Sequence, residues 1–215
     1  MDRRIALKNM GLAFGYTVAT PTLIGLMQSC QDEKSINWTP SFFTKDQALA
    51  LTQLVDIILP KTDTPSASEV KVDVFIDRYA NEVMDENTQE FILMVFDVFN
   101  NNALKSSGKE QVADLSTKDL EMVLAKGLQV SKEEAEANEE TIEKYMEAKI
   151  QGENIDLNEN VAISAFATNL RNMTIWAYKT SEYIGEEVLA YLPVPGEYVP
   201  CGDLEELTGG KAWSI

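Results

Sequence analysis

The chain has 215 residues, of which 45% are apolar, so it can bury the core of one ordinary domain and is marginal for two. Its 35 acidic and 18 basic side chains give a net charge of −17, which argues against nucleic-acid binding because such a surface repels phosphate backbones. The sequence has no histidine and therefore lacks the commonest metal ligand and the commonest general base near neutral pH.

Residues 1–29 have the composition of an export signal. A basic start that contains Arg3, Arg4 and Lys8 precedes a mildly apolar run over residues 11–27. The arginine pair, followed by a hydrophobic residue and a lysine, resembles the signal that the twin-arginine export route recognises. The low hydrophobicity of the run also favours that route over general secretion.

The apolar run could instead be a retained membrane-spanning helix. It has seventeen residues and is interrupted by Gly15 and Pro21. A bilayer core requires roughly 20 apolar residues, so the run is short for a membrane span. We therefore expect the leader to be removed or processed to a lipid anchor.

Cys30 directly follows Ser29, at the position where a bacterial lipoprotein is cleaved and acylated. The acidic residues Asp32 and Glu33 come next and are typical of a flexible tether. Because an acidic surface repels anionic lipid, a lipid on Cys30 would be the route to the membrane. The sequence predicts a tether over residues 30–40 and a periplasmic, membrane-anchored lipoprotein of a Gram-negative bacterium. The alternative is a cysteine that lies near the cleavage site by chance.

Periodicity after the tether is helical almost throughout, which predicts a single all-α domain over residues 41–215. In the first helix Leu51, Leu54 and Val55 share one face, Thr44 can cap the start, and Pro60 ends it. No segment of useful length has the alternating pattern of a β-strand. About six helices are expected, over residues 44–59, 69–84, 88–104, 116–128, 131–150 and 158–179.

Two of these helices carry specific burial predictions. Over residues 69–84, the side chains of Val72, Phe75, Ile76 and Tyr79 fall on one face, which predicts that this face packs into the core. The helix over residues 88–104 is apolar nearly all round and is therefore predicted to be the central buried helix.

From about residue 181 the composition changes to a mixture of proline, glycine and aromatic residues. Proline and glycine at this density cannot form a long helix, so an extended tail is predicted. One interpretation is a lid that lies over the domain's own core. The other is a partner interface, because amphipathic aromatic side chains make good interface anchors. The candidate interface residues are Tyr183, Tyr191, Pro193, Pro195, Tyr198 and Trp213.

No arrangement of residues in the sequence predicts catalysis, a cofactor or a metal site. A Ser-His-Asp or Cys-His set is impossible without histidine, and neither a dinucleotide fingerprint nor a phosphate-binding loop is present. Cys201 has Asp203, Glu205 and Glu206 as close neighbours, and carboxylates disfavour a reactive thiolate. An enzyme that relies on carboxylates alone is the weakest of the readings.

Three passages together resemble a known family, the gluconate 2-dehydrogenase subunit 3 family. They are residues 42–44 with 56–60, residues 62–67 with 74–77, and residues 191–198 with 210–213. The resemblance extends from the leader to the last residues, although the segment 88–151 adds nothing to it.

The resemblance implies a small, non-catalytic subunit of a periplasmic sugar or sugar-acid dehydrogenase complex. In such complexes a large flavoprotein of the glucose-methanol-choline oxidoreductase type holds FAD, and a cytochrome often accepts the electrons. The small subunit carries the export signal and assists the flavoprotein, so no cofactor is expected in this chain. The alternative is a free-standing lipoprotein that binds a carbohydrate or another ligand through its aromatic tail.

Overall fold

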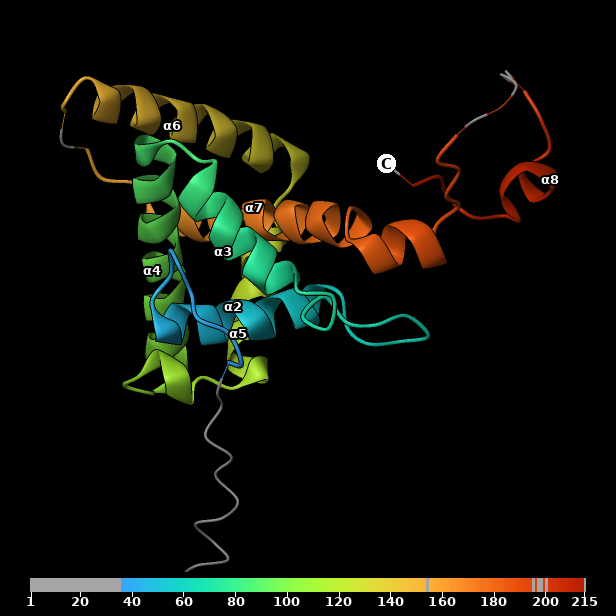
Figure 1. Cartoon of the computed structure of the whole chain (residues 1–215). Coiled ribbons are helices and arrows are strands. Elements are labelled where there is room, and N and C mark those ends of the chain that lie inside the picture. The colour runs from blue at the N-terminus through green and yellow to red at the C-terminus, as the bar shows by residue number, and fades with distance from the viewer. Residues whose placement is uncertain (1–35, 154, 195, 197–198, 200, 215) are drawn as a thin grey trace, which may run out of the picture. The chain divides into compact units, whose positions relative to one another are not determined.

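The computed structural model describes residues 36–153, 155–194, 196, 199 and 201–214, and it confirms the all-α class. Within these residues there is no β-strand, and six helices of at least eleven residues correspond to the six predicted (Figure 1). They are α2 (Lys45–Ile58), α3 (Val72–Glu82), α4 (Glu86–Ser107), α5 (Thr117–Leu128), α6 (Lys132–Ile150) and α7 (Glu159–Lys179). The shorter elements are η1 (Val112–Asp114, a 3-10 turn), η2 (Ile184–Val188, a π-helical turn) and α8 (Leu204–Thr208).

The helix starts follow the capping residues in the sequence. The side chain of Thr44 accepts the backbone N–H of Gln47, whose side chain accepts the N–H of Thr44, and Ser131 and Glu134 form the same reciprocal pair. Such capping boxes satisfy amide groups that a helix cannot bond internally. The predicted cap at Thr44 is therefore confirmed.

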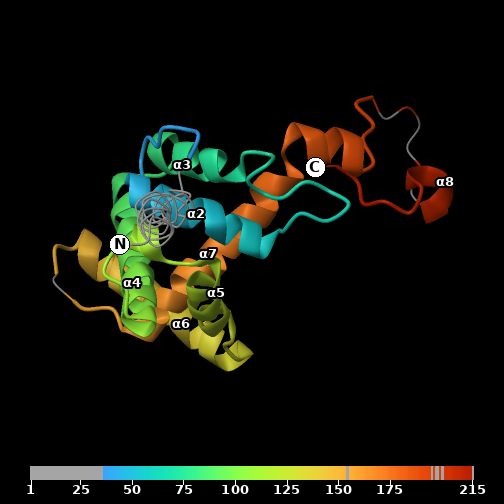
Figure 2. The ribbon, with the colours of Figure 1, turned by 90° about the horizontal axis from the view of Figure 1, so that it is seen from below.

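The central helix is α7, not α4. It packs against α2, α3, α4, α5 and α6, and Figure 2 shows it running through the middle of the helices. Its Phe166 ring stacks on Phe96 with ring centres 4.5 Å apart and lies 4.7 Å from Phe99. In α4 the fully buried side chains lie on one side, and apolar neighbours such as Leu93 and Met94 are only half-buried. The prediction that residues 88–104 form the central buried helix is therefore wrong.

Helix α3 buries only part of the predicted face, because Val72 and Ile76 are buried whereas Phe75 and Tyr79 are not. Its buried residues are Val72, Asp73, Ile76, Asp77 and Ala80. The side chain of Phe75 is 38% exposed, and that of Tyr79 is half-buried. The reason is that two aspartates, which an apolar pattern assigns to solvent, are buried and make hydrogen bonds.

The carboxylate of Asp77 binds the start of the described chain. It accepts the backbone N–H groups of Ser41 at 2.6 Å and of Phe42 and Phe43 at 3.0 Å each. Three donors to one carboxylate satisfy its oxygens away from bulk water. The segment before α2 is therefore fixed to α3.

Two further carboxylates join α2 to its surroundings. Asp73 accepts the indole N–H of Trp38 at 3.1 Å and the hydroxyl of Thr52 at 2.6 Å. Asp56 accepts the backbone N–H of Ser68 at 2.8 Å and its hydroxyl at 2.7 Å. The first two of the three passages that resemble the family thus lie where α2, α3 and the intervening loop meet.

Of the helices that the structure describes, none combines the length and the apolar character that a membrane span requires.

Candidate partner interface

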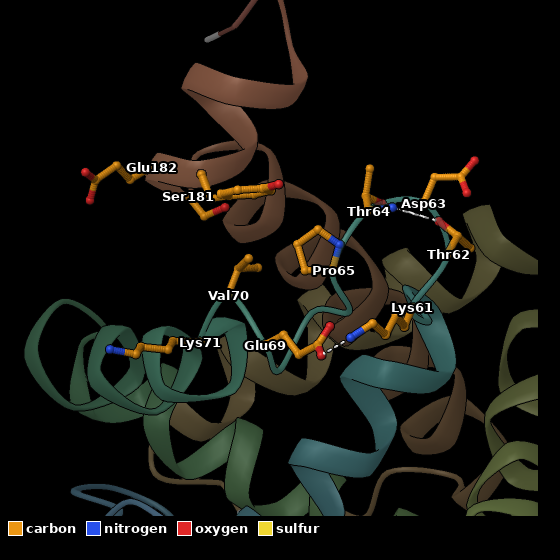
Figure 3. A pocket seen from close by; sticks show the side chains of 11 residues that line it. Lys61, Thr62, Asp63, Thr64, Pro65, Glu69, Val70, Lys71, Ser181 and Glu182 are labelled. Carbon is orange, nitrogen blue, oxygen red and sulfur yellow. Dashed lines mark hydrogen bonds and ion pairs between the residues drawn. The ribbon is translucent and has the colours of Figure 1, made fainter.

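A cleft of about 540 Å³ lies between the loop that precedes α3 and the turn that follows α7 (Figure 3). On the loop side the ammonium group of Lys61 pairs with a carboxylate oxygen of Glu69 at 2.6 Å. The hydrogen bonds from Lys61 and from the Ser66 backbone lower the pKa of Glu69. The lining consists of Lys61, Thr62, Asp63, Thr64, Pro65, Glu69, Val70, Lys71, Ser181, Glu182 and Tyr183.

The two sides of this cleft are held together by one side chain. The hydroxyl of Tyr178, at the end of α7, donates to the carbonyl of Pro65 at 2.7 Å and lies 3.0 Å from the hydroxyl of Thr64. The loop therefore has a fixed position against α7. Hydroxyl groups and exposed charges line the cleft, an arrangement that suits the binding of a polar surface.

Residues 189–214, which we call the C-terminal lobe, form a loop that closes on itself. The backbone N–H of Ala190 donates to the carbonyl of Ala212 at 2.8 Å, and the N–H of Ser214 donates to the carbonyl of Ala190 at 2.9 Å. Within the lobe, the side chain of Asp203 accepts two backbone N–H groups and so caps α8. The lobe thus has defined ends and a short helix, and it is not wholly extended as predicted.

The lobe buries none of its described side chains from residue 191 onward. An apolar surface of this kind marks an interaction site when it is contiguous. The described side chains from residue 191 onward are therefore not buried against the core. Its exposed large apolar side chains are Tyr191, Leu192, Val194, Val199, Leu204, Leu207 and Trp213.

The predicted interface residues fall into three groups. Tyr183 is 52% exposed, lines the cleft and precedes the lobe in the sequence. Tyr191, Pro193 and Trp213 are exposed in the lobe, where the pairing of Ala190 with Trp213 brings its two ends together. The remaining predicted residues lie outside the described part of the chain, and these are Pro195, Tyr198, Arg3, Arg4 and Cys30.

An aromatic cluster that the sequence pattern did not predict lies between α3 and α7. Trp176 meets Phe75 with ring centres 5.3 Å apart and Tyr79 at 5.5 Å, both edge to face. Trp176 is 41% exposed, as is its neighbour Ile175. The available signal was the pair of aromatic residues four apart in α3 with an arginine between them, which is unusual for a core-facing stripe.

Ionisable groups in the described residues have structural partners or are exposed. No group of three or more histidine, cysteine, aspartate and glutamate residues there could hold a metal ion. Asp73 and Asp77, the two buried carboxylates of α3, are engaged by the bonds described above. Cys201 has a free, exposed thiol.

Comparison with known proteins identifies a family. The family model for gluconate 2-dehydrogenase subunit 3 matches residues 45–196. No curated protein and no solved structure gives a significant match. The matched region spans α2 to α7 and the cleft, and it ends inside the C-terminal lobe.

Proposed function

The chain belongs to the gluconate 2-dehydrogenase subunit 3 family, and from that premise we propose that it is a non-catalytic accessory subunit of an FAD-dependent sugar or sugar-acid dehydrogenase complex. Its partner is a flavoprotein of the glucose-methanol-choline oxidoreductase type, which holds the FAD and performs the oxidation. The accessory chain assists the export, folding or stability of that flavoprotein. The complex is periplasmic, is anchored through a lipid on Cys30, and can pass electrons to a cytochrome.

The exposed C-terminal lobe is the observation that carries this proposal. Ordering a loop costs roughly 1–2 kcal/mol per residue in backbone entropy, and burial of apolar side chains normally offsets that cost. The described residues of the lobe have a defined backbone without such burial. A partner surface that covers Tyr191 and Trp213 would supply the missing burial, and aromatic residues of this kind dominate many interfaces.

The chemistry of the lobe defines the surface that it would fit. Residues 189–214 contain four carboxylates, from Glu197, Asp203, Glu205 and Glu206, and one lysine, Lys211. The partner surface is therefore an apolar groove with a basic rim.

Purification of the full-length, tagged protein from its native cells tests the proposal. A flavin absorbance spectrum and a co-purifying large subunit are expected. The double variant Tyr191→Ala/Trp213→Ala should melt like the wild type and lose most of the flavin, because each anchor contributes about 2 kcal/mol at an interface. Ile150→Ala, which shortens an exposed apolar side chain at the end of α6, is the matched control and should retain the flavin.

Truncation before Pro193 separates the two interpretations of the tail. A folded variant that loses the flavoprotein supports an interface. A variant that does not fold would support the interpretation of the tail as a lid over the core. A folded variant that still binds the flavoprotein would contradict the proposed role of the lobe. Gluconate binding by the protein free of any flavoprotein would instead support a carbohydrate-binding lipoprotein.

A further inference from the structure

The cleft and the C-terminal lobe meet at one packed contact. Gly185 is buried in η2, the turn that connects α7 to the lobe. A Cβ atom at Gly185 would lie 3.1 Å from the hydroxyl oxygen of Ser214, which is closer than most real contacts of a Cβ atom. The end of the lobe therefore packs directly on η2. Tyr183, which lines the cleft, comes just before η2, and Trp213 comes just before Ser214.

This contact limits the distance between Tyr183 and Trp213. Tyr183 is two residues from Gly185, Trp213 is next to Ser214, and consecutive Cα atoms are about 3.8 Å apart. Together with the packed contact, this spacing places the Cα atoms of Tyr183 and Trp213 within about 20 Å of each other. One side of a standard protein interface covers about 800 Å², a patch roughly 30 Å across. A protein that covers Trp213 with an interface of ordinary size is therefore large enough to reach the cleft.

The loop wall of the cleft and the lobe lie at the same end of the domain. Figure 1 and Figure 2 both show the loop that precedes α3 and the lobe toward the C-terminal end of α7. The hydroxyl of Tyr178 fixes this loop through the carbonyl of Pro65. A concave site whose walls are already fixed loses little conformational entropy when a partner enters it.

The cleft and η2 together carry a net negative charge. Within the cleft Lys61 and Glu69 form an ion pair, so their charges cancel. Two further lysines lie nearby, Lys71 in the lining and Lys179 at the end of α7. They are outnumbered by four exposed carboxylates that form no ion pair with any described residue, and these are Asp63, Glu182, Glu186 and Glu187. This balance favours a partner segment that carries arginine or lysine.

From this continuity and this charge we propose that the flavoprotein inserts a basic loop into the cleft while its apolar groove covers the C-terminal lobe. The inference rests on the accessory role proposed above, and it assigns the cleft as a second contact with that partner. Tyr183, which is 52% exposed, is the aromatic anchor of this contact. Two contacts on either side of η2 would fix the orientation of the flavoprotein.

Photo-crosslinking in the native complex tests where the flavoprotein lies. Replacement of Thr62, an exposed residue of the cleft, by a photo-crosslinking amino acid should capture the flavoprotein that co-purifies with the full-length chain. The captured segment should contain more lysine and arginine than aspartate and glutamate. The matched control is the same replacement at Thr141, which is exposed on α6 and should capture no flavoprotein. No capture at Thr62, or capture of an acidic segment, would overturn the proposal.

Release of the flavoprotein from the immobilised full-length chain gives an energetic readout, because interface substitutions act mostly on the dissociation rate. Tyr183→Ala should release the flavin-containing subunit at least about tenfold faster than the wild type. Asp63→Lys/Glu182→Lys should also release it faster at low salt, and the difference should shrink as salt is raised, because ions screen exposed charges.

The control for the charge reversal is Glu133→Lys/Glu139→Lys, which changes two exposed carboxylates on α6 and should release the flavoprotein at the wild-type rate. All the substituted positions are exposed, so circular dichroism spectra should match that of the wild type. Wild-type release rates for both cleft variants would overturn the proposal.

The lobe variant separates this inference from the proposed function. Rapid loss of the flavoprotein from Tyr191→Ala/Trp213→Ala, together with wild-type release from both cleft variants, would overturn the role of the cleft and leave the accessory role standing. A wild-type chain that co-purifies no flavoprotein would overturn both.

Discussion

Asp77 and Phe43 are separated by 34 residues in the sequence, and the buried carboxylate of Asp77 accepts the backbone N–H of Phe43 at 3.0 Å. The same carboxylate accepts the amides of Ser41 and Phe42. It therefore replaces water for three donors at the point where the chain enters the domain. Residues 42–44 and 74–77, which belong to two of the passages that resemble the family, are thus joined by hydrogen bonds.

Replacement of Asp77 by alanine should lower the free energy of unfolding by about 2–4 kcal/mol, because it leaves buried amides without an acceptor and hydrogen bonds to a charged group contribute about 1.5–3 kcal/mol. Urea denaturation followed by circular dichroism would measure the change. Asp63→Ala is the control, since Asp63 is exposed in a loop and its loss should change stability by less than about 0.5 kcal/mol. Similar midpoints for both variants would contradict the structural role of Asp77.

The ion pair between Lys109 and Asp119 predicts a pH dependence of stability. The ammonium group lies 2.7 Å from the carboxylate, which is mostly shielded, and Ser116 also donates to it. These hydrogen bonds hold the pKa of Asp119 well below its usual range. The pKa of an aspartate in the unfolded chain is about 3.9, and the lower pKa in the folded protein means that the ionised carboxylate stabilises the fold at pH values above 3.9. That stabilisation is lost as the pH falls through the pKa of the folded protein.

Asp119→Asn should therefore be less stable than the wild type at pH 6, and the difference should shrink as the pH is lowered below 4. Denaturant midpoints of both proteins between pH 2 and pH 7 would show it. Asp156→Asn, at an exposed loop position, is the control and should track the wild type throughout. A difference between Asp119→Asn and the wild type that is constant with pH would mean that the carboxylate's charge is irrelevant.

Gly127 permits the close approach of α5 to α7. A Cβ atom there would lie 2.8 Å from the Cβ of Ala167 and 2.9 Å from the carbonyl oxygen of Ile163. Alanine in a helix normally stabilises by about 1 kcal/mol relative to glycine, but overpacking costs about 1–3 kcal/mol. Because backbone is one of the clashing partners, we expect Gly127→Ala to lower the melting temperature.

Thermal unfolding checks that expectation for Gly127. Lys126→Ala changes the neighbouring exposed position and should leave the melting temperature nearly unchanged. A higher melting temperature for Gly127→Ala would mean that α5 can move away from α7 at little cost.

Helix boundaries could be predicted because they depend on neighbouring residues. Thr44 and Ser131 cap helices with partners three residues away, so the sequence contains the whole interaction. The orientation of α3 could not be predicted in this way. Its buried face includes Asp73 and Asp77, whose donors lie 21 to 36 residues away, and an apolar pattern therefore selects Phe75 and Tyr79 instead.

The sequence predicted which residue types make up the candidate interface, but it did not predict the closed backbone path of the C-terminal lobe. Proline, tyrosine and tryptophan marked the C-terminal region as unusual, and Tyr191 and Trp213 are indeed exposed. The closure of the lobe depends on backbone bonds between Ala190 and the residues around Ala212. Any residue can make such backbone hydrogen bonds, so the identities of the side chains do not predict them.

The twin-arginine motif predicts that Arg3 and Arg4 export a second protein as well as this one. That route moves folded proteins, and its usual reason is a cofactor inserted in the cytoplasm, which the sequence gives this chain no motif to hold. A folded pair, with the flavin in the partner and the signal here, would account for both facts.

Arg3→Lys/Arg4→Lys should therefore leave this chain and a signal-less flavoprotein in the cytoplasm, with periplasmic dehydrogenase activity reduced and total flavoprotein unchanged. Lys8→Arg, which keeps the charge and the arginine pair, should export both normally. Normal export of the flavoprotein in the double variant, or a signal of its own, would contradict co-export.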